Sequence, residues 1–312
     1  MIRNDEKNQP LISVIVPTFE RSDLLPRALD SVFAQTWKNI EVVIVDDNLP
    51  GSVWAKETAK VLEAYRDREN VLCLKTAGKT GGGAARNFAL RRCHGDYVAF
   101  LDDDDRYLPD KLEKQLAFTV EHGLDGSYHD VRWFNEKEQQ VEYRSMDWTE
   151  DFSRQGLLKA HILHSLCPTA IYLFRRDKLL ETEGFGEVPS GQDFILMLRC
   201  IESGMKLGYL EGAYVIQYLH SGARISLGDG KIKGETMLYR LKQEYFDLLT
   251  EEERVYVKFR HNAVLAFASM RSGRPVQAAG YALSTVRTSP VTCAREAVRY
   301  LKAKFRRCDS SG

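Results

Sequence analysis

Short apolar runs alternate with segments of helical periodicity through the first 120 residues of the chain. The runs predict buried strands at Leu11–Val16, Ile40–Val45, Val71–Leu74 and Tyr97–Leu101, and the first of them is rich in β-branched residues. The segments between and after them repeat apolar residues every three or four positions, which predicts helices at Leu24–Gln35, Ala55–Tyr65, Ala84–Arg92 and Pro109–Glu121. Strands that alternate with helices in this way predict βαβ units and a largely parallel sheet.

The alternation weakens after residue 130 and gives way to helices towards the carboxyl terminus. Further strands are expected at Tyr128–Phe134, Val141–Met146, Thr169–Phe174 and Tyr214–Leu219, and helices at Phe152–Leu163 and Asp193–Ser203. From about residue 230 the pattern is helical throughout. Residues 291–307 form a basic amphipathic segment, because apolar side chains recur on one face and arginines and lysines fill the other.

Length and charge bound the organisation of the chain. The 312 residues suit one large domain, or one domain with an appendage. Lys+Arg and Asp+Glu both total 44, so the formal net charge is zero. The segment from Arg254 to Arg307 nevertheless contains twelve Lys or Arg residues against the single acidic residue Glu296. The amino-terminal part therefore carries a compensating negative excess.

Several classes of protein are disfavoured by the same sequence. The first ten residues lack the apolar region of a signal peptide, and no run approaches 18 apolar residues, so no membrane span is expected. The six cysteines are scattered without a Cys-x-x-Cys pair, which favours reduced thiols over disulfides or zinc ligands. We therefore expect a cytoplasmic protein.

Four consecutive carboxylates, Asp102–Asp105, follow the predicted strand Tyr97–Leu101. Adjacent negative charges repel one another, so a cation is expected where a buried strand ends in such a cluster. Carboxylate oxygens suit Mg²⁺ or Mn²⁺ shared with the phosphates of a substrate. The alternative is a solvated turn in which an Asp caps the helix that follows.

Other predicted strands and loops also end in polar residues. The first strand leads into Pro17-Thr-Phe-Glu-Arg21 and the second into Asp46-Asp47. Because parallel strands place their carboxyl ends at one edge of the sheet, these residues and the Asp cluster predict an active face. The loop Gly81-Gly-Gly-Ala-Ala-Arg-Asn87 precedes a helix, but it fits neither the dinucleotide fingerprint nor the P-loop pattern.

Taken in order, these motifs resemble those of the family 2 glycosyltransferases, which have the GT-A fold. The segments that carry the resemblance are Val14–Arg21, Leu29–Thr36, Ile40–Asp47, Gly83–Asn87, Phe100–Asp105, Phe174–Asp177 and Gly191–Asp193. They span residues 10–226, with a nucleotide-binding half at 10–105 and an acceptor half at 106–226. Residues 227–312 carry no motif of the family and are expected to form a helical, basic extension.

The resemblance implies a site for a nucleotide-sugar donor. Asp102-x-Asp104 matches the family's Asp-x-Asp, in which Asp104 would bind Mn²⁺ or Mg²⁺ and Asp102 would contact ribose or the metal. The positions expected to bind the nucleotide sugar are Pro17, Thr18, Glu20, Asp46, Asp47, Gly83, Arg86, Asp102 and Asp103. Asp46 could instead be a structural residue of the strand end, and Asp105 could cap a helix or belong to the site.

The nucleobase positions depart from the family's usual residues in two places. Glu20 stands where Pro-x-x-Asn-Arg has Asn, and Asp-Asp-Asn-Leu replaces the usual Asp-Asp-Gly-Ser, which puts Asn48 in the place of Gly. A carboxylate can accept the imide N–H of a uracil-type base. The resemblance thus favours a UDP-sugar or dTDP-sugar over a GDP-sugar.

Three further residues acquire roles by the same resemblance. Asp193, in Gly191-Gln-Asp193, would be the general base of an inverting transfer, with helix capping as its alternative. Arg86 would reach the donor's phosphate or ribose, unless it forms a salt bridge with the Asp cluster. His220 would approach the metal or diphosphate, with an ordinary structural histidine as the alternative.

The acceptor is expected to be a glycan or a polyprenyl-linked sugar. The product is expected to be a bacterial surface polysaccharide, because many members of the resembled family make one. Trp133 and Trp148 could stack on acceptor sugars, although core packing is the preferred interpretation. The segment 291–307 is read either as docking on the inner, anionic face of the cell membrane or as a solvated cap or oligomer contact. Nucleic-acid binding is not expected, since no recognition motif accompanies the charge.

Two classes of protein remain as alternatives to the glycosyltransferase. Another nucleotide-dependent α/β enzyme, a nucleotidyltransferase or a dehydrogenase, would use the same face but would need phosphate signatures that the Gly81 loop lacks. A catalytically silent nucleotide-sugar binding module would be expected to have lost the carboxylates, yet Asp104 and Asp193 are both present.

Overall fold

The computed structural model describes residues 9–219, 229–296 and 298. The four strands predicted in the amino-terminal half are present as β1 (Ile12–Thr18), β2 (Ile40–Asp46), β3 (Val71–Lys75) and β4 (Tyr97–Phe100). They are followed by the predicted helices α1 (Leu25–Phe33), α2 (Val53–Glu63), α3 (Gly82–Leu90) and α4 (Lys111–Glu121). The apolar runs and the 3.6-residue helical period thus locate these elements to within about two residues.

The later strands and helices are less regular. They comprise β5 (Arg106–Tyr107), β6 (Gly126–Asn135), β7 (Gln140–Arg144), β8 (Leu173–Arg175) and β9 (Leu207–Leu219), with helices α5 (Arg154–His164), α6 (Arg176–Leu180) and α7 (Gln192–Glu202). The strand expected at Thr169–Phe174 is wrong in its first half, because Thr169–Ile171 forms a 3-10 turn and only the end enters β8.

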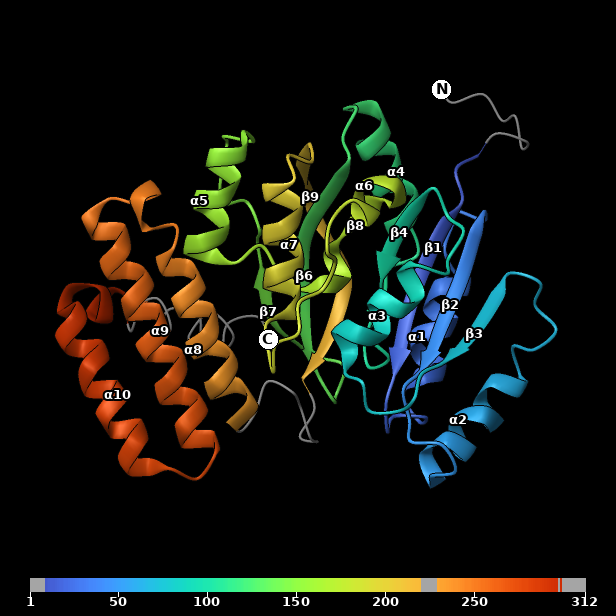
Figure 1. The fold of residues 1–312 in the computed structure, drawn as a ribbon, viewed down its shortest axis with the longest axis horizontal. Helices are drawn as coiled ribbons and strands as arrows, with labels where there is room; N and C mark the ends of the chain where they lie inside the picture. Colours follow the sequence, from blue (N-terminus) through green and yellow to red (C-terminus); the bar gives the residue numbers. More distant parts are fainter. Residues whose placement is uncertain (1–8, 220–228, 297, 299–312) are drawn as a thin grey trace, which may run out of the picture. The chain divides into compact units, whose positions relative to one another are not determined.

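One mixed sheet contains the nine strands of the described residues, in the order β3-β2-β1-β4-β8-β6-β9-β5, with β7 beside β6 (Figure 1). β3, β2, β1 and β4 are parallel. β8 is antiparallel to β4 and β6, whereas β6 and β9 are parallel. The expected α/β fold, with a largely parallel amino-terminal half of the sheet and flanking helices, is confirmed.

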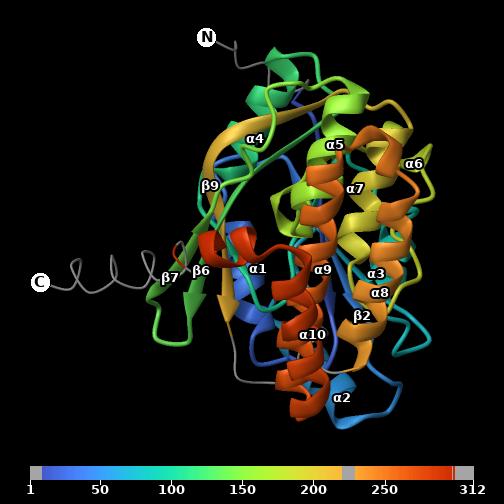
Figure 2. The ribbon, with the colours of Figure 1, turned by 90° about the vertical axis from the view of Figure 1, so that its left-hand side faces the viewer.

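Alternate residues of the parallel strands pack against helices on opposite faces of the sheet. Val14, Val16, Val42 and Ile44 belong to one fully buried cluster with Leu25 and Leu29 of α1 and Leu112 and Leu116 of α4. Figures 1 and 2 show α1 and α4 on this face and α3 and α7 on the other. Burial of both faces explains why these strands are continuously apolar.

The chain divides into two compact units. One comprises residues 1–161, 165–187 and 192–221, and contains the sheet. The second comprises residues 162–164, 188–191 and 222–312, and its described helices are α8 (Asp229–Gln243), α9 (Glu251–Arg271) and α10 (Pro275–Thr288). The prediction that the chain is helical from about residue 230 is therefore confirmed for the described residues up to 296, and most of the predicted basic segment 291–307 lies outside the described residues.

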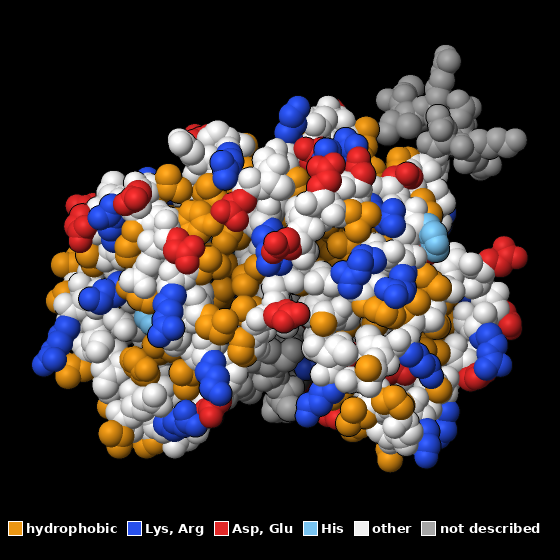
Figure 3. Space-filling model, viewed as in Figure 1, with side chains coloured by type: hydrophobic (Ala, Val, Ile, Leu, Met, Phe, Trp, Pro, Cys, Tyr) orange, Lys and Arg blue, Asp and Glu red, His pale blue; other side chains and the backbone are white. Residues whose placement is uncertain are grey.

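The distribution of charged side chains and the state of the cysteines agree with what the composition predicts. Acidic and basic side chains are interspersed over the face of the molecule shown in Figure 3. The five described cysteines are free thiols, of which Cys93 and Cys200 are buried; Cys73 is exposed, although its strand is apolar. None of the described helices is both long and apolar enough to cross a bilayer.

Candidate active site at the carboxyl edge of the sheet

Parallel pairing brings the predicted donor-binding segments to one edge of the sheet. Thr18 at the end of β1 is paired with Asp46 at the end of β2, and Ile15 is paired with Phe100 on β4. The next residues along each strand therefore leave the sheet at the same edge. There, the backbone N–H of Asp47 donates to the carbonyl of Thr18, at 3.0 Å.

The four carboxylates after β4 divide into two half-buried and two buried groups. The side chains of Asp102 and Asp104 retain 34% and 15% of their exposure, whereas Asp103 and Asp105 are almost completely buried. One oxygen each of Asp102, Asp104 and Asp105 can be chosen so that all lie within 4.8 Å of one another. A cluster of hard oxygen donors at this spacing fits a divalent cation.

Asp103 faces inwards and holds the loop that follows β1. Its carboxylate accepts hydrogen bonds from the backbone N–H of Phe19 at 3.3 Å and from Nη1 of Arg21 at 3.2 Å. Burial, followed by the charge of Asp104, raises the pKa of Asp103 to about 7. Its predicted contact with the nucleotide sugar is untested, and its visible contacts are with loop 19–21.

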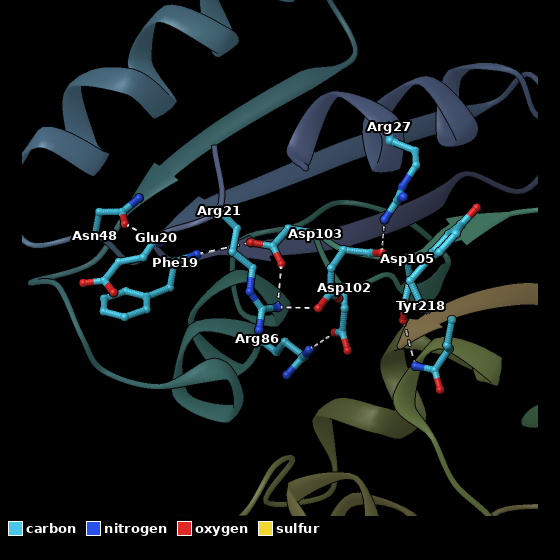
Figure 4. Close-up of polar contacts among 12 residues, drawn as sticks. Phe19, Glu20, Arg21, Arg27, Asn48, Arg86, Asp102, Asp103, Asp105 and Tyr218 are labelled. Carbon is cyan, nitrogen blue, oxygen red and sulfur yellow. Dashed lines mark hydrogen bonds and ion pairs between the residues drawn. The ribbon is translucent and has the colours of Figure 1, made fainter. Parts of the chain in front are cut away.

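Two arginines from other parts of the chain form ion pairs with the half-buried carboxylates (Figure 4). Arg21, in the loop after β1, contacts Oδ2 of Asp104 at 2.5 Å, and Arg86, in the middle of α3, forms an ion pair with Asp102. Burial lowers the pKa of Arg21, but the charges of Asp104 and Asp103 outweigh burial and raise it. The salt bridge considered as the alternative for Arg86 is present in the structure.

Asp105 is an anchor and not the cap of a helix. Its Oδ2 accepts from Nε2 of Gln217 at 2.7 Å, and its Oδ1 accepts from the backbone N–H of Tyr218 at 3.1 Å, both on β9. The capping alternative is wrong, because β5 follows directly and Asp110 is the N-cap residue of α4. Asp105 therefore connects the acidic loop to the end of β9.

Asp46 and Asp47 take different positions at the end of β2. Asp46 is within the strand and accepts from the backbone and side-chain amides of Asn48, which agrees with the structural alternative for this residue. Asp47 holds the loop before α3. Its carboxylate accepts from the hydroxyls of Thr76 and Thr80 and from the backbone N–H of Gly81, the last at 2.9 Å. Asp47 therefore sets the position of the glycine loop.

The glycine loop lies against the segment that contains Asp193. A Cβ atom added at Gly83 would be 3.0 Å from Oε1 of Gln192 and 3.2 Å from Cβ of Phe185. Only a glycine allows this approach without displacement of its neighbours. Asp193 follows in the first turn of α7, is half-buried, and accepts from the backbone N–H of Phe194 at 2.9 Å.

Three predictions concern aromatic side chains. His220 lies outside the described residues, and β9 ends at Leu219. Trp133 and Trp148 are half-buried and are not among the fully buried core residues, so packing against the core stays a prediction for both. The guanidinium of Arg144 lies 5.4 Å from the ring centroid of Trp133.

Arg27 and Gln217 belong to none of the motifs recognised in the sequence, and they were not predicted as part of the site. Arg27, on α1, donates to the carbonyl of Asp104 at 2.5 Å and lies 3.7 Å above the ring of Tyr218. Of the arginines near the acidic cluster on this side, Arg21 could have been predicted, because it ends the motif Pro17–Arg21. These residues come from distant elements, and their contacts depend on tertiary packing.

Comparison with known proteins agrees with this geometry. The model of the family described as Glycosyl transferase family 2 matches residues 13–181. The putative colanic acid biosynthesis glycosyl transferase WcaA of Escherichia coli (strain K12) is 26% identical over 282 residues, which are 86% of this chain and 96% of WcaA.

A second relative matches a shorter part of the chain. The UDP-Glc:alpha-D-GlcNAc-diphosphoundecaprenol beta-1,3-glucosyltransferase WfaP of Escherichia coli is 31% identical over 118 residues, 38% of this chain and 45% of WfaP. Its similarity therefore concerns less than half of either protein.

Two solved structures share the fold. Residues 1–349 of Staphylococcus aureus TarS, in complex with UDP-GlcNAc, superpose with a TM-score of 0.60 at 19% identity and cover 89% of this chain and 88% of that one. The mannosyltransferase PcManGT from Pyrobaculum calidifontis, in complex with GDP-Man and Mn²⁺, gives a TM-score of 0.57 at 15% identity, with 95% and 81% covered.

Proposed function

Since the chain belongs to glycosyltransferase family 2 and is a glycosyltransferase, we propose that it transfers a sugar from a UDP-sugar, or a dTDP-sugar, with inversion at the anomeric carbon. The observation that carries this proposal is the pair of half-buried carboxylates Asp102 and Asp104, which two arginines contact at the carboxyl edge of the sheet. An anionic diphosphate with a divalent cation complements both signs of charge there.

Asp102 and Asp104 are the residues that would hold Mn²⁺ or Mg²⁺. They retain exposure and accessible oxygens, whereas both oxygens of Asp105 are engaged by β9. His220 stays a prediction as a further ligand. When bound, the cation supplies positive charge against the departing diphosphate.

Arg86 and Arg21 are proposed to bind the diphosphate. A guanidinium is planar and can donate two parallel hydrogen bonds to phosphate oxygens. Both arginines already lie beside the carboxylates, so a small side-chain rotation suffices to exchange a carboxylate partner for a phosphate. Thr18, Glu20 and Asp47 are proposed to line the nucleobase, with Pro17, Asp46, Asp103 and Gly83 shaping the backbone around it.

Asp193 is proposed as the general base. An acceptor hydroxyl would give its proton to the carboxylate while its oxygen forms a bond to the anomeric carbon; the bond from that carbon to the diphosphate breaks, and the diphosphate leaves with the electron pair. The position of Asp193 in the first turn of α7 supports an ionised carboxylate, because a helix amino terminus favours negative charge.

The acceptor is proposed to be a glycan or a polyprenyl-linked sugar in bacterial surface polysaccharide synthesis. The names of the relatives WcaA and WfaP support this class, and WfaP acts on a diphosphoundecaprenol acceptor by its name. A cytoplasmic enzyme that docks through residues 291–307 on the inner face of the cell membrane would meet such an acceptor. Residues 10–226 are proposed to carry catalysis and residues 227–312 this extension.

The Asp193→Asn variant tests the proposed reaction. The amide cannot take a proton, so we expect a loss of at least about a hundredfold in transfer with UDP affinity nearly unchanged. Product formation from a panel of UDP-sugars would be followed by mass spectrometry, and UDP binding by calorimetry. Asp177→Asn, an exposed position paired with Arg175, is the matched control. Full activity of Asp193→Asn would exclude this base.

A further inference from the structure

Two of the positions at which this chain departs from the family's usual residues, Glu20 and Asn48, are in direct contact. The backbone N–H of Glu20 donates to Oδ1 of Asn48 at 2.7 Å, although the residues are 28 positions apart. The family usually has an asparagine at position 20, where this chain has Glu20. Here the side-chain amide comes instead from Asn48, just after the end of the neighbouring strand β2 (Figure 4).

Glu20 has a backbone conformation that a glutamate rarely adopts. Its φ angle is +56°, in the left-handed region that glycine and asparagine tolerate better. An external contact must therefore stabilise this conformation. The hydrogen bond that the Glu20 N–H donates to Oδ1 of Asn48 is the contact that the structure provides.

Asn48 is itself held in one orientation. It is 4% exposed, and its Nδ2 donates to Oδ1 of Asp46 at 2.8 Å and to the hydroxyl of Thr58 on α2 at 3.1 Å. Because the NH₂ group faces a carboxylate, the amide oxygen must face Glu20. The strand end and α2 together therefore fix the acceptor for the Glu20 N–H.

The left-handed conformation of Glu20 directs the side chains of Glu20 and Arg21 away from each other. Arg21 turns towards Asp103 and Asp104, whereas the Glu20 side chain points away from them (Figure 4). Glu20 is exposed, and its carboxylate has no hydrogen-bond partner among the residues that the structure describes. Glu20 therefore presents a free carboxylate in the loop that follows β1, two residues after Thr18.

We propose that Glu20 and Asn48 form a coupled pair that selects the nucleobase of the donor. Glu20 accepts the ring N–H of a uracil-type base, and Asn48 is a positioning residue that keeps Glu20 in the required conformation. Cytosine presents a lone pair instead of that N–H, so the same carboxylate repels it. This inference rests on the proposed UDP or dTDP donor and adds the residues that discriminate between pyrimidines.

Calorimetric titration with UDP and CDP in the presence of Mn²⁺ tests the pair. For the wild type we expect UDP to bind at least about tenfold more tightly than CDP, since a hydrogen bond to a charged group is gained with one base and lost with the other. Glu20→Gln should remove most of this preference. Glu69→Gln, an exposed glutamate before β3 at the opposite end of the sheet, is the control and should keep it.

A double-mutant cycle tests the coupling itself. Asn48→Ala should reduce the UDP preference in the same direction, and Glu20→Gln combined with Asn48→Ala should be no worse than Glu20→Gln alone. Glu20→Asn combined with Asn48→Gly restores the family's usual residues, should remain folded because asparagine tolerates positive φ, and should bind UDP and CDP more equally.

An unchanged UDP preference in Glu20→Gln, or single effects that multiply in the double variant, would overturn the inference. Failure of the proposed function is distinct from this outcome, because in that case the wild type binds neither UDP nor dTDP. Thermal unfolding of each variant shows whether it is folded before its affinities are compared.

Discussion

At the scale of single residues, burial divides the polar groups of the sheet unit into those that ligands can reach and those that they cannot. Asp102 and Asp104 retain exposure, whereas Lys111 and His129 are completely buried in the same unit. Nζ of Lys111 donates to the carbonyl of Tyr172 at 3.3 Å, and burial lowers the pKa of Lys111 well below its ordinary value. The buried pair therefore has a structural role.

His129 gives a prediction about acid stability. Burial, followed by the charge of Lys111, lowers its pKa from 6.5 to about 3. A depressed histidine pKa stabilises the fold above pH 6.5, and this stability is lost as the pH falls towards 3, because the unfolded chain then binds the proton that the fold excludes. The contribution lost between pH 7 and pH 5 is about 2 kcal/mol.

Urea unfolding at pH 7 and pH 5 checks this prediction. The wild type should lose more free energy of unfolding over this interval than His129→Asn, by about 2 kcal/mol, whatever the absolute stability of the variant. His94→Asn is the control, since His94 is exposed and lies on the surface beside Glu41. Parallel pH profiles for the wild type and His129→Asn would contradict the prediction.

At the scale of the elements, the acidic loop depends on β9 through Asp105. The carboxylate holds both the side chain of Gln217 and the backbone N–H of Tyr218. Burial, followed by the charges of Asp104 and Asp102, raises the pKa of Asp105 well above its ordinary value. The fold tolerates this carboxyl group because both of its oxygens accept hydrogen bonds.

Two substitutions of Asp105 distinguish the contribution of its hydrogen bonds from that of its charge. Asp105→Ala leaves the N–H of Tyr218 buried without an acceptor, so we expect a loss of about 1–3 kcal/mol and faster amide exchange at Tyr218. Asp105→Asn should retain most of the stability, because its carbonyl accepts from Tyr218 and its NH₂ can donate to Oε1 of Gln217. Equal stability of the alanine and asparagine variants, measured in urea, would refute the anchor.

Elements with a strong period were predictable from the sequence, and contacts between distant elements were not. Continuous apolar runs identified β1, β2 and β4, and the order of the motifs identified Asp102, Asp104 and Asp193 as candidate site residues. β5 has two residues, too few to show a period. Asn48 and Asp105 have partners 28 and more than 110 residues away, so only the packed chain shows that they are linked.

At the scale of the whole molecule, the charge asymmetry of the chain distinguishes the sheet unit from the helical carboxyl-terminal region. The segment from Arg254 to Arg307 contains twelve Lys or Arg residues and only one acidic residue. In the described part of this region, Val276 of α10 and Val291 are 86% and 69% exposed. Basic and exposed apolar side chains together are typical of a surface that binds anionic lipid.

Truncation after Ser289 tests this property. We expect the shortened chain to bind vesicles that contain anionic lipid at least about tenfold more weakly than the full chain, because it lacks most of the basic segment 291–307. Vesicles of neutral lipid are the control and should bind both forms weakly. Unchanged sedimentation with anionic vesicles would favour the alternative of a solvated cap or an oligomer contact.

The central claim is that the acidic edge of the sheet binds a uracil- or thymine-type nucleoside diphosphate together with a divalent cation. Calorimetric titration of UDP with and without Mn²⁺, on the wild type and on Asp104→Ala, tests it most directly. We predict UDP binding that depends on Mn²⁺ in the wild type and at least about tenfold weaker binding in the variant. UDP binding that is indifferent to Mn²⁺ and to Asp104, or binding of NAD in place of UDP, would contradict it.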